Sequence, residues 1–113
     1  MIDWIQLRQL QSDVGKDEMD EVVELFLTEV DEAIEVFQKN VGAMAFADKG
    51  AAYHFLKGCA FNLGFQAFGE KCSEGEEVSK QNKNPDISLS DLVALYAASK
   101  DVFHRNYKAE MIL

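Results

Sequence analysis

Apolar residues recur every three or four positions along most of the chain, which is the spacing of helices that bury one face. Stretches that alternate apolar and polar residues and are rich in β-branched side chains, as strands are, are almost absent. The helical period predicts five helices, over residues 3–11, 17–39, 43–63, 66–82 and from Ser88 or Ser90 to about residue 110. The expected breaks between them are residues 12–15, residues 40–42, Gly64 and the polar stretch 81–86.

Long helices joined by short loops pack as antiparallel neighbours. We therefore expect an all-α fold, an antiparallel four-helix bundle with a short additional N-terminal helix laid across it. The 113 residues fit a single helical domain, residues 1–113, and 48% apolar residues are enough for one core. The third helix is expected to bury a stripe made of Tyr53, Leu56, Ala60 and Leu63, and Phe55 and Cys59 widen this stripe on one flank. The fourth helix is expected to bury Phe68, Cys72, Gly75 and Val78 or Ser79.

Acidic residues outnumber basic ones by 20 to 11, which gives a formal net charge of −9. No nucleic acid and no anionic membrane surface is expected as a partner, because both bind clustered Lys and Arg. We expect protein partners with a neutral or basic docking face. No apolar run is long enough to span a bilayer or to form the core of an export signal, so a cytoplasmic protein is expected. Cys59 and Cys72 then remain reduced thiols, and they lack the spacing of a zinc site.

One stripe of the third helix is not explained by core packing. It occupies positions i, i+3, i+4 and i+7 of one face, and its members are His54, Lys57, Gly58 and Phe61. A glycine inside a helix costs roughly 1 kcal/mol relative to alanine, which is tolerated where another group must approach the backbone closely. Lys57 places a cation about one turn from the imidazole. That cation disfavours a second positive charge on the ring and would stabilise a transferred phosphoryl group.

A single histidine on a helix is more often an ordinary surface or core residue than a reactive one. The lysine and the glycine beside His54 favour a function, because core packing accounts for neither. Phe61 offers an apolar contact to a docking protein. Lys71 and Lys80 of the fourth helix could add positive potential near His54, but ordinary solvated lysines are the favoured interpretation. His104 has no partner pattern and is expected to be a surface residue.

The run from His54 to Gly64 is HFLKGCAFNLG. It resembles the signature of histidine-containing phosphotransfer (HPt) domains, which is His-x-Leu-Lys-Gly followed by two small residues, two variable residues and Leu-Gly. The helical pattern of the whole chain is similar to the four-helix bundle of that family. Family members commonly have serine at one or both positions after the glycine, where this chain has Cys59 and Ala60. Both residues are small, so we expect packing to be kept and any hydrogen bond from a serine hydroxyl to be lost.

The resemblance implies a phosphorelay intermediate of two-component signal transduction, a phosphoprotein that is a phosphocarrier and not an enzyme with kinase activity of its own. His54 would accept a phosphoryl group from a receiver-domain aspartate, with Nε2 as the favoured ring atom, and pass it to another response-regulator receiver. Lys57 would give electrostatic support, and Gly58 would allow the partner to approach closely. The expected partners are receiver domains and a hybrid histidine kinase, and the chain itself is expected to be a monomer. No cofactor or metal is expected on this chain, because Mg²⁺ and acidic groups come from the receiver.

The docking surface is expected to include Phe61 and, from the first helix, Trp4 and Ile5. One rival interpretation is a non-catalytic adaptor that binds receivers without carrying phosphate, although such an adaptor needs neither His54 nor Lys57. Another is an acidic helical bundle that serves only as an interaction module.

Overall fold

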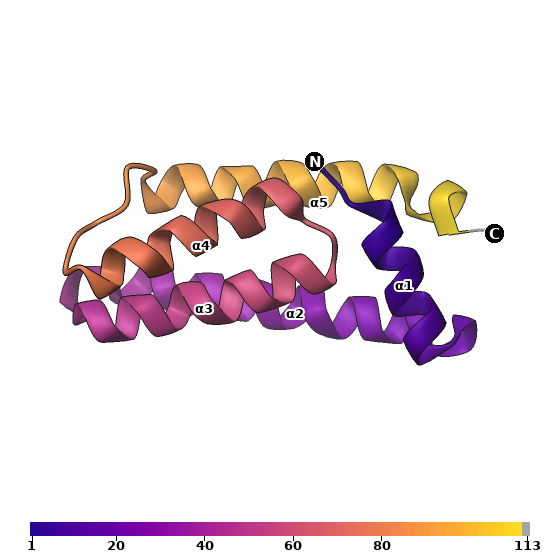
Figure 1. Cartoon of the computed structure of the whole chain (residues 1–113), viewed down its shortest axis with the longest axis horizontal. Helices are drawn as coiled ribbons and strands as arrows, with labels where there is room; N and C mark the ends of the chain where they lie inside the picture. Colours follow the sequence, from indigo (N-terminus) through magenta and orange to yellow (C-terminus); the bar gives the residue numbers. More distant parts are fainter. Residues whose placement is uncertain (112–113) are drawn as a thin grey trace.

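The computed structural model describes residues 1–111 and shows an all-helical chain. Its elements, in chain order, are α1 (Trp4–Val14), α2 (Lys16–Asn40), the 3-10 helix η1 (Val41–Ala43), α3 (Phe46–Asn62), α4 (Gln66–Lys80) and α5 (Leu89–Met111). Helices α2 to α5 form an antiparallel four-helix bundle, and α1 crosses the end where α2 and α5 extend beyond the α3–α4 hairpin (Figure 1). The predicted fold is confirmed. No helix in this part of the chain is long and apolar enough to cross a membrane.

The first helix is longer than the sequence predicts. The Asp3 side chain caps its N-terminus by accepting a hydrogen bond from the Gln6 amide at 3.2 Å. Instead of breaking at residue 12, α1 continues to Val14 and ends at Gly15, which has a φ of +93°. The polar residues of its last turn are compatible with a helix because their side chains bond locally, as in the 3.1 Å contact between Gln9 and Asp13.

The starts of two other helices are also settled by the structure. The third helix begins at Phe46 and not at residue 43, because η1 forms a separate turn and Met44 is extended. Of the two serines that could cap the last helix, Ser88 does so. Its hydroxyl accepts a hydrogen bond from the Asp91 amide at 3.0 Å.

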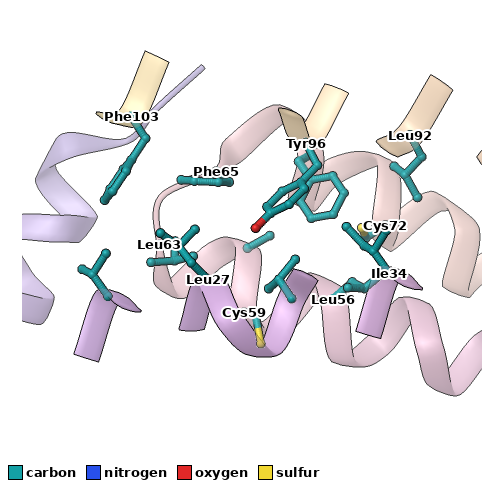
Figure 2. Close-up of a cluster of buried hydrophobic side chains, with 14 of the residues drawn as sticks. Leu27, Ile34, Leu56, Cys59, Leu63, Phe65, Cys72, Leu92, Tyr96 and Phe103 are labelled. Atoms are coloured by element: carbon teal, nitrogen blue, oxygen red, sulfur yellow. The ribbon is translucent and has the colours of Figure 1, made fainter. Parts of the chain in front are cut away.

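The core runs along the bundle and receives side chains from all five α-helices, with Leu7 as the buried residue of α1. Figure 2 shows a part of this core to which α2, α3, α4 and α5 contribute. Aromatic rings form much of it: Phe65 lies 5.5 Å from Phe103 and 6.0 Å from Tyr96, measured between ring centroids. The predicted core residues that are buried in α3 and α4 and at their junction are Tyr53, Leu56, Cys59, Ala60, Leu63, Phe68, Cys72, Gly75 and Ser79. The prediction for Phe55 is wrong. Its side chain is 43% exposed because it lies at the edge of α3, beside a groove shared with α2.

The α3–α4 hairpin is closed at Gly64 and held by the first residues of the chain. Gly64 has a φ of +72°, and a Cβ on it would lie 2.5 Å from the Asp3 carbonyl oxygen. The Asp3 amide donates a hydrogen bond to the Gly64 carbonyl at 2.7 Å, and the Gln66 amide donates to the Met1 carbonyl at 3.1 Å. The predicted stop at Gly64 is confirmed, and glycine is required there both by conformation and by close packing.

Two glycines of α4 allow α3 to pack closely against it. A Cβ on Gly75 would lie 2.6 Å from the Tyr53 ring, and a Cβ on Gly69 would lie 2.6 Å from the Phe61 ring. Both rings therefore lie directly over the backbone of α4. This contact sets the separation of the two helices and, with it, the distance between the side chains they direct toward each other.

Candidate functional site

His54 and Glu76 meet across the contact between α3 and α4. The His54 side chain is 69% exposed on the outer face of α3, and its Nδ1 lies 2.8 Å from Oε2 of Glu76. The Glu76 side chain is only 12% exposed, because it belongs to the buried face of α4. An exposed imidazole is therefore held by a carboxylate that the bundle itself immobilises.

Lys57 binds the other oxygen of the same carboxylate. It follows His54 by three residues on α3, and its ammonium donates a hydrogen bond to Oε1 of Glu76. This bond from Lys57 lowers the pKa of Glu76 below its ordinary value; desolvation opposes the shift, and the bond with His54 supports it. Glu76 is therefore an anion at neutral pH, and it is shared between an ammonium and an imidazole.

The carboxylate determines which ring nitrogen of His54 can react. An ionised carboxylate only accepts hydrogen bonds, so Nδ1 carries the proton in the contact with Glu76. In the neutral ring, Nε2 then holds the free lone pair. None of residues 1–111 forms a hydrogen bond with Nε2. The arrangement presents Nε2 as a nucleophile on an exposed surface.

Glu76 is the main residue of this site that the sequence analysis missed. The sequence predicts Lys57 as the charged group beside the imidazole, whereas the structure places a carboxylate between them. A signal was present in the pattern, because Glu76 falls on the same face of α4 as the buried Cys72 and Ser79. A carboxylate on a buried face needs a cation or another donor as partner.

Gly58, the mid-helix glycine, faces open space. Beyond the adjoining backbone of α3, a Cβ at this position would meet no atom of the described chain within 4 Å. Packing within the described chain therefore gives no reason for glycine there, in contrast to Gly69 and Gly75 of α4. The close approach of a partner stays a prediction for this residue.

A cleft of about 320 Å³ opens beside His54, between the first half of α3 and the end of α4. Its lining is mostly apolar and small, and it includes Lys80 as well as His54 and Glu76. Lys80 therefore lies on the same side of the bundle as the imidazole. Lys71 does not line this cleft and forms an ion pair with Glu74 at 3.2 Å instead.

The three residues predicted for docking lie in different settings. Phe61 is 38% exposed and covers Gly69, on the same stripe of α3 as His54. Trp4 is half-buried and stacks on Phe103 with ring centroids 5.8 Å apart, so its ring also packs against the core. Ile5 is 76% exposed on α1.

A second apolar area lies between α2 and α3, where Phe55 follows His54 in the chain. It is a groove of about 500 Å³ with Val36 and Met44 among its apolar residues, and Glu29 and Glu32 also line it. Val36 is 60% exposed and Phe55 is 43% exposed. An apolar surface with acidic residues along it therefore lies next to the imidazole-bearing stripe.

The remaining reactive side chains lie in ordinary structural positions. Cys59 and Cys72 are both free and buried. Burial raises the pKa of both thiols, that of Cys72 to about 12, which makes them poor nucleophiles at neutral pH. His104 is exposed on α5 with its ring edge-on to Phe103 at 5.6 Å.

In a comparison with protein families, the family model described as Hpt domain matches residues 21–101. The matched region begins in α2 and ends in α5, so it spans the four bundle helices and includes His54, Lys57 and Glu76. Comparisons with curated proteins and with solved structures give no match.

Proposed function

Because the chain belongs to the Hpt domain family, we propose that it is a phosphorelay intermediate of two-component signalling. His54 accepts a phosphoryl group from the aspartyl phosphate of one receiver domain and passes it to the aspartate of another response-regulator receiver. The observation that supports this most directly is the hydrogen bond between His54 Nδ1 and Glu76. It leaves Nε2 as the available nucleophile on an exposed face.

In the proposed transfer, the lone pair of Nε2 attacks phosphorus in line with the aspartyl oxygen. The P–N bond forms while the P–O bond breaks, and the aspartate leaves as a carboxylate with the bonding electron pair. The proton on Nδ1 stays in place, so the phosphorylated ring carries a positive charge beside the Glu76 carboxylate. Transfer to the second receiver reverses these events. Such a step depends mainly on positioning and charge stabilisation.

Lys57 is the electrostatic support of the proposed reaction. It lies one turn from His54, and Glu76 holds its ammonium in the unphosphorylated protein. A lysine ammonium is a compact charge on a flexible stem, so it can turn from the carboxylate to the phosphoryl oxygens once these arrive. The receiver supplies Mg²⁺ and acidic residues in this proposal, and this chain acts as a phosphocarrier without kinase activity of its own.

We propose that the receiver docks over the outer face of α3. Gly58 lets the partner approach the helix next to His54, since no side chain rises there. Phe61 on one side and Phe55 on the other are the exposed apolar residues nearest to His54 along α3. Ile5 is an outer docking candidate, and Trp4 adds the exposed part of a ring that also packs on Phe103. The proposal has the chain act as a monomer in the cytoplasm, with a hybrid histidine kinase as the source of phosphate.

The direct test is transfer of a phosphoryl group from a panel of purified phosphorylated receiver domains. We expect an acid-labile, base-stable label on the wild-type chain and none on His54→Gln. The His54 side chain is mostly exposed and bonded only through Nδ1, so the variant should fold normally, which circular dichroism can verify.

Two results would overturn the proposal. A wild-type chain that stays unlabelled with every receiver, while still binding one of them, would indicate a non-catalytic adaptor. A label that persists in His54→Gln would place the phosphate on another residue.

A further inference from the structure

We propose that Glu76 keeps phosphorylated His54 labile, by holding the proton on Nδ1 through the whole transfer cycle. The inference rests on the proposed function for the identity of His54 as the phosphate carrier. It adds a positioning residue that sets how long the phosphohistidine survives. The observations behind it are the 2.8 Å contact between His54 Nδ1 and Glu76 and the small exposed fraction of the Glu76 side chain.

The lability follows from the group that leaves phosphorus when the P–N bond breaks. A ring that keeps its Nδ1 proton takes the bonding electrons on Nε2 and departs as neutral imidazole. A ring without that proton has to depart as an imidazolide anion, which is a far poorer leaving group. The attacking aspartate of a receiver, or a water molecule, therefore displaces the protonated ring much faster.

Glu76 stabilises the protonated form by charge as well as by hydrogen bonding. After phosphorylation, the ring with its Nδ1 proton is a cation in contact with an anion, and an opposite charge at this distance favours the charged form. The carboxylate cannot move away easily, because its side chain lies in the packed face of α4 next to the Tyr53–Gly75 contact. No proton has to be gained or lost in either half of the relay.

The other charged groups around His54 either disfavour the protonated ring or make no contact with it. Lys57 on α3 shares the Glu76 carboxylate and competes with the ring for it. Lys80 on α4 lines the same cleft as His54 and adds a second positive charge. On the α2 side, Glu29 and Glu32 line the groove beside Phe55 and form no hydrogen bond with the His54 ring in the described chain. The ring is therefore labile because of its contact with Glu76.

The test uses a small chemical donor, so that no partner protein is needed. Potassium phosphoramidate phosphorylates histidine directly, with ammonia as the leaving group. ³¹P NMR then distinguishes Nε2 from Nδ1 attachment and follows the decay between pH 5 and pH 9. In wild type, we expect Nε2 to be labelled and fast hydrolysis to persist to a higher pH than in Glu76→Gln. The pH at which hydrolysis falls to half its maximal rate should be lower in Glu76→Gln than in wild type, by about one pH unit or more. Above the wild-type midpoint, the phosphohistidine of the variant should therefore have a lifetime about tenfold longer.

Two further variants make the result specific. Glu77→Gln removes the same charge from the exposed neighbouring position of α4 and should leave the profile of wild type unchanged. Lys57→Gln removes the neighbouring cation but keeps Glu76 and its contact with the ring, so its midpoint should not fall as that of Glu76→Gln does. Folding of each variant is checked by circular dichroism.

The outcomes separate this inference from the proposed function. If Glu76→Gln and wild type decay with the same pH profile, Glu76 does not control lability, even if receivers phosphorylate His54 normally. Labelling on Nδ1 instead of Nε2 would also overturn the inference. If the decay profiles differ as expected but no receiver transfers phosphate, the relay function fails while the role of Glu76 stands.

Discussion

The Tyr53 ring lies directly over Gly75, so closely that a Cβ on the glycine would stand 2.6 Å from the ring. Each of these residues immediately precedes one member of the hydrogen-bonded pair, His54 on α3 and Glu76 on α4. The Tyr53–Gly75 packing contact and the His54–Glu76 hydrogen bond therefore lie next to each other in the interface between the two helices. A substitution that alters the packing of Tyr53 on Gly75 is therefore expected to alter the hydrogen bond between His54 and Glu76.

Gly75→Ala should disturb both the fold and the site. Tyr53 is only 4% exposed, so its ring cannot move into solvent, and overpacking of this kind costs about 1–3 kcal/mol. The gain in helix propensity from alanine, roughly 1 kcal/mol, offsets only part of that. We expect a lower free energy of unfolding in urea and a weakened Nδ1–H signal of His54 in imidazole ¹⁵N NMR. An unchanged Nδ1–H signal in a stable variant would show that the interface tolerates the extra methyl group.

Gly58→Ala should act in the opposite direction on stability. Beyond the adjoining backbone of α3, no atom of the described chain lies within 4 Å of the added Cβ, so the variant gains helix propensity and its free energy of unfolding rises by about 0.5–1 kcal/mol. Phosphoryl transfer from a receiver should slow, because the methyl group stands where the partner approaches. Chemical denaturation and transfer kinetics measure the two effects separately. A stabilised variant that accepts phosphate at the wild-type rate would exclude a close approach at Gly58.

Lys57→Gln should slow phosphoryl transfer by about 100-fold or more, the size of effect seen when one preorganised group that stabilises developing charge is removed. The matched control is Lys71→Gln on α4. Lys71 forms an ion pair with Glu74 and does not line the His54 cleft, so its removal changes the net charge equally without touching the site. Single-turnover transfer from one labelled receiver compares the two. Equal slowing in both variants would mean that net charge matters and the position of Lys57 does not.

The stability of the protein should depend on Glu76 below about pH 5. The pKa of Glu76 is lowered in the folded state from an unfolded value near 4.5, chiefly by the Lys57 hydrogen bond. A carboxyl group of this kind stabilises the fold fully above its unfolded pKa, and the contribution is lost as the pH falls through the folded value. The stability difference between wild type and Glu76→Gln should therefore shrink between pH 6 and pH 3 in urea titrations. Glu77→Gln should differ little from wild type across this range, and a constant difference for Glu76→Gln would contradict the prediction.

The periodicity of the sequence was sufficient for the helices and for the stripe that carries His54, because both depend on spacing within one helix. Glu76 could not be found in this way. Which residue faces His54 depends on the alignment of α3 against α4, and that alignment is set by Gly64 and by the packing of Tyr53 on Gly75. No local pattern encodes a register between two helices.

The error at Phe55 has a related cause. A broad apolar arc on α3 is compatible with a helix that is buried on three sides. The arc alone does not determine how much of it the neighbouring helices cover. The structure leaves a groove between α2 and α3, so Phe55 is partly exposed. The break predicted from residue 12 failed for a simpler reason. Polar residues lower helix propensity only slightly in a last turn, whereas Gly15 with its positive φ ends the helix outright.

The hydrogen bonds of Asp3 with Gly64 and of Gln66 with Met1 have a kinetic consequence for folding. They join points about 60 residues apart, whereas His54 and Glu76 are joined across one helical hairpin, and closing the longer loop costs more chain entropy. Local contacts of this kind tend to form early. The hairpin can therefore bring the imidazole to its carboxylate before the first residues of the chain are fixed. Fraying at the N-terminus would then loosen the turn without separating His54 from Glu76.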